Sequence, residues 1–145
     1  YSGTGKTWFF VSLSLTVLHF KRIVFVPKQV FFMRSMFAPL VAWGIGTILK
    51  KVFSRQRPYQ RIENYSAQIS LPNCNSFPSS HASSSMAFFF ALALVHHPLA
   101  LAVGVWASLV TFSRYYLGVH FPSDLLGGIV LGLICGVGIG CLFMA

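Results

Sequence analysis

The apolar segment at the end of the chain constrains the fold most. Residues Leu125 to Ala145 contain no charged side chain and are rich in Gly, Leu, Ile and Val. About 20 such residues are enough for a helix to cross the hydrocarbon core of a bilayer. In the whole chain 55% of the residues are hydrophobic and 9% are charged, a composition that is rare among soluble domains. The sequence therefore predicts a protein that is embedded in a membrane.

Four further apolar segments precede this one. They are Trp8–Phe20, Val30–Leu49, His81–Val95 and Leu99–Phe112. Inside a bilayer a chain must satisfy its backbone hydrogen bonds internally, as a helix does. We therefore predict an all-α fold, a multi-pass transmembrane helical bundle with about five spans in this chain. In the last span, Gly128, Gly132 and Gly136 have the four-residue spacing that favours close helix packing in membranes.

The chain is strongly basic, with eleven Lys and Arg against two acidic residues, Glu63 and Asp124, and a formal net charge of +9. The basic residues lie between the apolar segments rather than along one soluble face, which argues against a nucleic-acid-binding protein. Anionic lipids or phosphate-bearing substrates are the partners that this charge favours. The three cysteines are odd in number and irregularly spaced, so we predict neither a disulfide framework nor a metal site.

Two basic groups lie at the two ends of the segment Val30–Leu49, with four Lys and Arg in residues 21–34 and five in residues 50–61. The positive-inside rule does not separate four from five. If part of the second group serves a catalytic site, the first group is the better topological signal. The polar segment 50–80 would then lie outside the cytoplasm.

Chemically useful side chains gather in three clusters at the predicted helix ends. The first cluster runs from Lys50 to Pro58 and carries Lys50 and Arg57, seven residues apart. On a helix that continued this far, both side chains would share one face and could bind an anion together. Taken alone, the cluster slightly favours a structural explanation, in which basic side chains reach for lipid headgroups.

The second cluster, Phe77 to His81, opens an apolar segment. Ser79 or Ser80 could cap this helix, and the same geometry presents backbone N–H groups and hydroxyls to an anion. His81 then lies in the first turn. A histidine at such a position is usually structural, but beside an anion site it is a candidate proton donor.

The third cluster runs from Ser113 to Asp124 and contains Arg114 and His120. His120 precedes Asp124 by four residues, and a carboxylate near a histidine can fix the imidazole tautomer. The structural explanation is that Asp124 caps the last helix and suits its dipole. Ionisable groups so close to hydrocarbon are costly, which favours a functional role.

Together the three clusters resemble the signature of the type 2 phosphatidic acid phosphatase superfamily. That signature is Lys-x6-Arg-Pro, then Pro-Ser-Gly-His, then Ser-Arg-x5-His-x3-Asp. Order and internal spacing match from Lys50 to Asp124, and one position departs, because Ser80 stands where the family has Gly. If that Gly is needed for a positive φ, Ser80 would strain the backbone; if only its N–H is needed, Ser80 serves nearly as well. The resemblance implies that residues 1–145 form a single membrane phosphatase domain that lacks an N-terminal helix, in a full-length protein of six spans.

The resemblance also implies a role for each matched residue. His120 is the nucleophile that attacks phosphorus, Asp124 orients it, and His81 is the general acid. The groups that bind the phosphate oxygens are Lys50, Arg57, Ser79, Ser80 and Arg114. The reaction needs no metal and no cofactor, and vanadate is expected to inhibit it.

The expected function is therefore hydrolysis of a lipid phosphate or diphosphate through a phosphohistidine. The expected site is the extracytoplasmic face of a membrane, such as a bacterial inner membrane. Two other interpretations stay open. A transporter or channel subunit with a basic anion site would be supported by internal inverted symmetry, and none is visible in the sequence. A non-catalytic lipid-binding protein is the other, although every matched catalytic residue is present.

Overall fold

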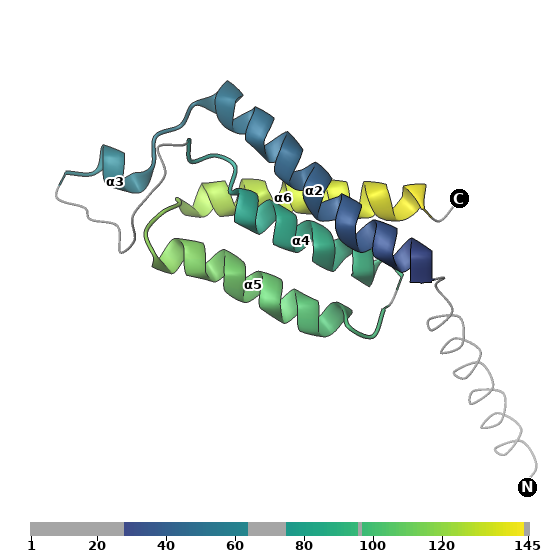
Figure 1. Ribbon diagram of the computed structural model, residues 1–145. Coiled ribbons are helices and arrows are strands. Elements are labelled where there is room, and N and C mark those ends of the chain that lie inside the picture. Colours follow the sequence, from purple (N-terminus) through teal and green to yellow (C-terminus); the bar gives the residue numbers. More distant parts are fainter. Residues whose placement is uncertain (1–27, 64–74, 96, 144–145) are drawn as a thin grey trace, which may run out of the picture.

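The computed structural model describes residues 28–63, 75–95 and 97–143, and in these ranges all regular structure is helical (Figure 1). The helices are α2 (Lys28–Phe53), α3 (Pro58–Arg61), α4 (Ser80–Ala93), α5 (Ala100–Tyr116) and α6 (Pro122–Leu142). The four long helices correspond to four of the predicted apolar segments, so the all-α prediction is confirmed. The fifth segment, Trp8–Phe20, lies outside the described residues.

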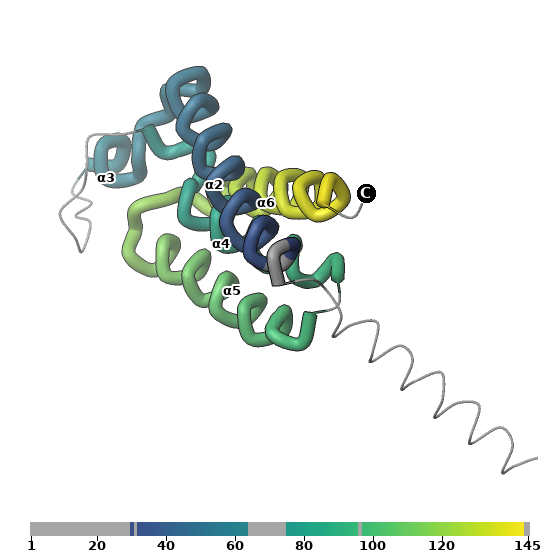
Figure 2. The backbone as a smooth tube through the Cα atoms, turned by 45° about the vertical axis from the view of Figure 1, so that its right-hand side comes forward, coloured from purple at the N-terminus to yellow at the C-terminus, as the bar shows by residue number. Residues whose placement is uncertain are grey.

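Helix α4 is the centre of the bundle and packs against α2, α5 and α6 (Figures 1 and 2). It can do so because one helix face carries small side chains. Ala82, Ala87 and Ala91 are fully buried, and Ser83 is buried among them. The hydroxyl of Ser83 donates to the carbonyl of Ser80, 3.1 Å away, so this polar group is satisfied inside its own helix. A thin central helix brings its three neighbours, and therefore their ends, close together.

The glycine spacing of α6 is the feature that sets its distance from α4. A Cβ atom added at Gly128 would lie 2.7 Å from the carbonyl oxygen of Ser79, and one added at Gly136 would lie 2.6 Å from that of Ala87. Both distances are shorter than real Cβ contacts. The predicted close packing along this face is confirmed, because only hydrogen atoms separate the two backbones there.

Replacing Gly132 with alanine is expected to destabilise the protein by about 1–3 kcal/mol, as over-packing does in other cores. The added methyl would lie 2.7 Å from both the Cβ atom of Met86 and the carbonyl oxygen of Ser83. Gly138→Ala is the matched control, because nothing lies within 4 Å of a Cβ atom there. Thermal unfolding in detergent measures both variants. Equal melting temperatures for the two would contradict this account of the packing.

Two helical segments of the described chain are long and apolar enough to cross a membrane. One lies within Phe32–Arg61 and has a mean hydropathy of 1.4, and the other is Pro122–Leu142 with 2.4. Large apolar side chains such as Trp43 and Trp106 point away from the bundle, as they would toward lipid. Helices α4 and α5 are shorter, at 14 and 17 residues. The predicted number of five spans is therefore not confirmed.

The end of α2 corrects one expectation from the sequence. Lys50 and Arg57 do not share a helix face, because α2 ends at Phe53. Ser54 adopts a positive φ of 43°, a left-handed conformation that a helix cannot continue through. The chain then runs extended to Arg57 and enters the short helix α3, which lies inside the segment expected to be a polar loop.

Candidate active site

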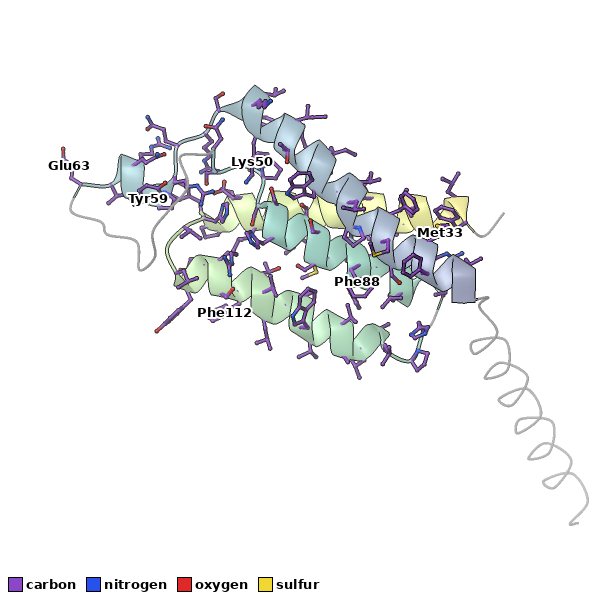
Figure 3. All side chains as sticks on the ribbon, viewed as in Figure 1. Met33, Lys50, Tyr59, Glu63, Phe88 and Phe112 are labelled. Atoms are coloured by element: carbon purple, nitrogen blue, oxygen red, sulfur yellow. The ribbon has the colours of Figure 1, made fainter. Side chains whose placement is uncertain are left out.

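The three sequence clusters come together at one end of the bundle. Lys50 lies in the last turn of α2, His81 in the first turn of α4 and Arg114 in the last turn of α5. Asp124 lies in the first turn of α6, and His120 lies in the short connection before it. Figure 3 labels Lys50 at the same end of the bundle as Tyr59 of α3, with Met33 at the other end.

A turn after α5 brings His120 back over the bundle. Gly118 has a φ of 68°, which side chains rarely tolerate, and its N–H donates to the carbonyl of Tyr115 over 2.9 Å. The N–H of Val119 then donates to the carbonyl of Arg114 over 3.3 Å. These bonds end α5 and set the position of the His120 backbone relative to Arg114.

Asp124 is the anchor of the site and is 0% exposed. Its Oδ2 accepts the N–H of Phe121 over 2.9 Å and the hydroxyl of Ser76. Its Oδ1 accepts Nη1 of Arg55 over 2.7 Å. A buried carboxylate is costly unless it is paired and hydrogen-bonded. These three donors therefore explain how the carboxylate is held beneath the site, and the cap at Phe121 is the structural role anticipated from the sequence.

His120 is 4% exposed, and its Nδ1 lies 3.6 Å from Oδ2 of Asp124. This distance is short enough for an ion pair but too long for a hydrogen bond, and Nδ1 has no hydrogen-bond partner. Burial lowers the pKa of His120 below its ordinary value of 6.5, because the charged imidazolium loses its hydration. The Asp124 carboxylate acts in the opposite direction, while the positive charges of Arg57 and Lys50 add to the lowering. The balance of these effects favours the neutral imidazole.

Arg57 is buried, with 5% of its surface exposed, and its Nη1 donates to the carbonyl of Val119 over 3.4 Å. Its own backbone N–H donates to Oε1 of Gln60 over 3.0 Å. The carbonyl of Lys50 accepts Nδ2 of Asn75 over 2.8 Å. The residue before α3 is thus bonded to the connection that carries His120, and Asn75, which follows α3 in the sequence, is bonded to the end of α2.

The positive charges converge on His81, whose side chain is exposed. Arg114, Lys50 and Arg57 all act electrostatically on its imidazole, as does His120. Three cations near two imidazoles form a site that attracts anions. This end of the bundle therefore combines positive charge with a buried histidine and an exposed one.

The start of α4 answers the question raised by Ser80. Ser80 is the first residue of α4, and the only non-glycine residue with a positive φ in the described ranges is Ser54. A Ser at this position therefore imposes no backbone strain. Ser79 is the N-cap of α4, and its hydroxyl accepts the N–H of Ala82 over 3.5 Å. Its N–H donates to the carbonyl of Asp124 over 3.0 Å, which joins the starts of α4 and α6.

Two residues that contact Asp124 were missed by the reasoning from sequence. Arg55 lies between the matched Lys50 and Arg57, and Ser76 lies before the second cluster. The one available signal was indirect, because the chain has many cations and very few acids to pair with them. The structure also adds no metal ligands, since the described ranges contain no group of three His, Cys, Asp or Glu side chains that could bind a metal ion.

The fold and the site define a helical membrane protein with a cationic end that carries a histidine–carboxylate pair. The family model of the PAP2 superfamily matches residues 30–144, and the chain belongs to that superfamily. This match covers all three sequence clusters.

Relatives and a solved structure agree with this assignment. The putative undecaprenyl-diphosphatase YbjG of Escherichia coli K12 is 37% identical over 70% of this chain and 47% of its own length. The bacitracin transport permease protein BcrC of Bacillus licheniformis is 29% identical over 87% of this chain and 61% of its own length. The crystal structure of a transmembrane PAP2-type phosphatidylglycerolphosphate phosphatase from Bacillus subtilis matches with a TM-score of 0.59 and 29% identity, over 90% of this chain and 69% of that one.

The chain spans about half to three fifths of the length of these curated relatives. The likeness to a transmembrane phosphatase and the two apolar helices indicate an integral membrane protein.

Proposed function

We propose that the protein hydrolyses a lipid phosphate or diphosphate without a metal, through a phosphohistidine on His120. The observation that carries the proposal is that Lys50, Arg57 and Arg114 act on the exposed His81, and that Lys50 and Arg57 also act on His120 in the buried histidine–aspartate pair. Catalysis of phosphoryl transfer depends mainly on positioning the reacting groups and on neutralising the charge of the phosphoryl oxygens. The three cations can neutralise that charge.

The first step is attack by a neutral imidazole on phosphorus. Nδ1 of His120 faces Asp124, so the other nitrogen, Nε2, is the atom that attacks. A bond forms between Nε2 and phosphorus while the bond from phosphorus to the leaving oxygen breaks. His81 donates a proton to that oxygen, and the imidazolium of phosphorylated His120 is stabilised by Asp124.

The second step is hydrolysis of the phosphohistidine. His81, now neutral, takes a proton from a water molecule that attacks phosphorus, and the bond to Nε2 breaks. Inorganic phosphate leaves, and His120 and His81 return to their starting states. In both steps the non-bridging oxygens are bound by the cations, with Ser79 and Ser80 offering further groups at the start of α4.

The proposed substrate is a lipid, because the bundle carries an apolar groove that could hold a hydrocarbon chain. The groove has a volume of about 420 Å³ and is lined by residues of α5 and α6 and by Met86 of α4. Leu125 and Tyr115 in its lining are the sequence neighbours of Asp124 and Arg114, while Ser108 and Ile129 lie further along the same helices. An amphiphile with an anionic head could therefore place its phosphate at His120 and its hydrocarbon chain in this groove.

The groove yields a prediction about chain length. Ile129→Trp is expected to lower kcat/KM for a long-chain lipid phosphate by about tenfold, because the larger ring occupies space meant for the chain. Hydrolysis of a water-soluble phosphate ester should change little. Val130→Trp is the matched control, because Val130 is the next residue, is largely exposed and does not line the groove. If Ile129→Trp reduced both substrates equally, or neither, the groove would not hold the chain.

The proposed orientation puts the site on the extracytoplasmic face. The support is that Lys50 and Arg57, from the second basic group, belong to the site, which leaves the first group as the topological signal.

Phosphate release by the detergent-purified protein tests the proposed function. The substrates would be undecaprenyl diphosphate, phosphatidic acid, phosphatidylglycerol phosphate and a lipid A phosphate, each assayed with EDTA. We expect release that continues in EDTA and is inhibited by orthovanadate, which resembles phosphate. Loss of release in EDTA would overturn the metal-independent mechanism. No release from any lipid by well-folded protein would favour transport, which the name of the Bacillus licheniformis relative supports, or binding without catalysis.

A further inference from the structure

Arg55 joins three separate segments of the chain. Its Nη1 donates to Oδ1 of Asp124 and to Oγ of Ser123, both over 2.7 Å. Its guanidinium carbon lies 4.6 Å from the centre of the Phe121 ring, a cation–π distance. Its backbone carbonyl accepts the N–H of Ser76 over 2.8 Å. Arg55 therefore joins the segment after α2 to the segment before α4 and to the start of α6.

The direction of this side chain separates Arg55 from the phosphate-binding cations. Arg114, Lys50 and Arg57 act electrostatically on the exposed His81. Arg55 forms an ion pair with the buried carboxylate of Asp124 through Oδ1. The oxygen nearest to His120 is Oδ2, so Arg55 and His120 contact different oxygens of the carboxylate.

The two oxygens of Asp124 have different partners as a result. Oδ1 accepts a hydrogen bond from Arg55. Oδ2 accepts hydrogen bonds from Ser76 and Phe121 and is the oxygen nearest to His120. With Oδ1 held, the carboxylate cannot rotate freely about its own axis. The oxygen that faces Nδ1 of His120 is therefore fixed by contacts on the far side of the carboxylate.

We propose, on the basis of the proposed function, that Arg55 is a positioning residue for the reaction. It holds Asp124 so that Oδ2 faces His120, and its charge offsets part of the carboxylate charge so that His120 stays neutral and nucleophilic. Arg55 acts through Asp124 and does not itself touch the substrate.

The charged groups around His120 determine the sign of the expected effect. Lys50 of α2, Arg57 before α3, His81 of α4 and Arg114 of α5 face the anion site, and Asp124 of α6 is paired with Arg55. Without the Arg55 charge, the Asp124 carboxylate would attract a proton on His120 more strongly. The pKa of His120 would rise, and the acid limb of kcat/KM would move to higher pH.

Variants of Arg55 test the proposal through the pH dependence of lipid phosphate hydrolysis. We expect Arg55→Gln to lower kcat by about 10- to 100-fold, as loss of an orienting partner does at other sites, with little change in KM. Its acid limb should move up by about half a pH unit or more. Arg55→Lys keeps the charge but not the planar fork, so it should lower kcat and leave the acid limb in place. Arg61→Gln, an exposed arginine of α3, is the matched control and should behave as wild type.

The outcomes are distinct. A raised KM with an unmoved acid limb in Arg55→Gln would make Arg55 a substrate-binding cation and overturn the proposal. Unchanged kcat and an unmoved acid limb in Arg55→Gln would show that Arg55 has only a structural role, and would also overturn the proposal. If Arg55→Gln does not fold, Arg55→Lys decides, since a raised KM with normal kcat contradicts the proposal. Failure of wild type to release phosphate at any pH would instead reject the proposed function.

Discussion

Replacing His120 with alanine is expected to abolish phosphate release from every lipid substrate, with a loss of roughly 1,000-fold or more. The reason is that no other group in the described site can form the covalent bond to phosphorus from the same place. His120 is buried beside Asp124, whereas His81 is exposed and lies on another helix. Steady-state phosphate release in detergent, with unfolding measured in parallel, is the assay.

His97→Ala is the matched control for that experiment. His97 lies in the turn between α4 and α5, at the other end of the bundle, where its Nδ1 accepts the N–H of Leu99 over 3.2 Å. We expect this variant to retain wild-type activity. If the His120→Ala protein is folded and keeps more than a few per cent of the activity, His120 is not the nucleophile.

Replacing Asp124 with asparagine is expected to lower kcat by roughly 100- to 10,000-fold, the range seen when the carboxylate behind a catalytic histidine is neutralised. An amide in this position can present an N–H to Nδ1 of His120 and favour the wrong tautomer. It also leaves Arg55 without its ion-pair partner.

The pH profile gives the same variant a second signature. Burial already puts the pKa of His120 below 6.5, and the Asp124 carboxylate raises it. Without that carboxylate the pKa falls further, so the acid limb of kcat/KM should move to lower pH in Asp124→Asn. This shift is opposite in direction to the one expected for Arg55→Gln. An unmoved acid limb together with normal kcat would mean that Asp124 only caps α6.

The helices were predicted from local rules, and the meeting of the three clusters at one site was implied by the resemblance to the phosphatase superfamily. Apolar segments of sufficient length form helices in a membrane, and clusters placed at helix ends meet when the helices pack side by side. The close packing along the glycines of α6 could be predicted for a similar reason, since their four-residue spacing places them on one face of the helix. A serine cap of α4, at Ser79 or Ser80, and Asp124 near the start of α6 were also expected from residue type and position, and Ser79 is the cap.

The path of the chain between α2 and α4 could not be predicted in the same way. Nothing in the residue types requires α2 to end at Phe53 or Ser54 to take a positive φ. Both depend on tertiary contacts, such as the hydrogen bond from Asn75 to the carbonyl of Lys50. The roles of Arg55 and Ser76 depend on that path, because they reach Asp124 across 69 and 48 residues of sequence.

The central claim is that phosphate passes through His120, and chemical trapping tests it most directly. Wild-type protein would be mixed with a lipid phosphate, quenched in alkali within the first turnover, digested and examined by mass spectrometry. Alkaline quenching is chosen because phosphohistidine is labile in acid. We predict a phosphoryl group on His120 that appears before inorganic phosphate and is absent from His120→Ala. A phosphoryl group on another residue, or a first turnover of free phosphate with no covalent intermediate, would contradict the mechanism.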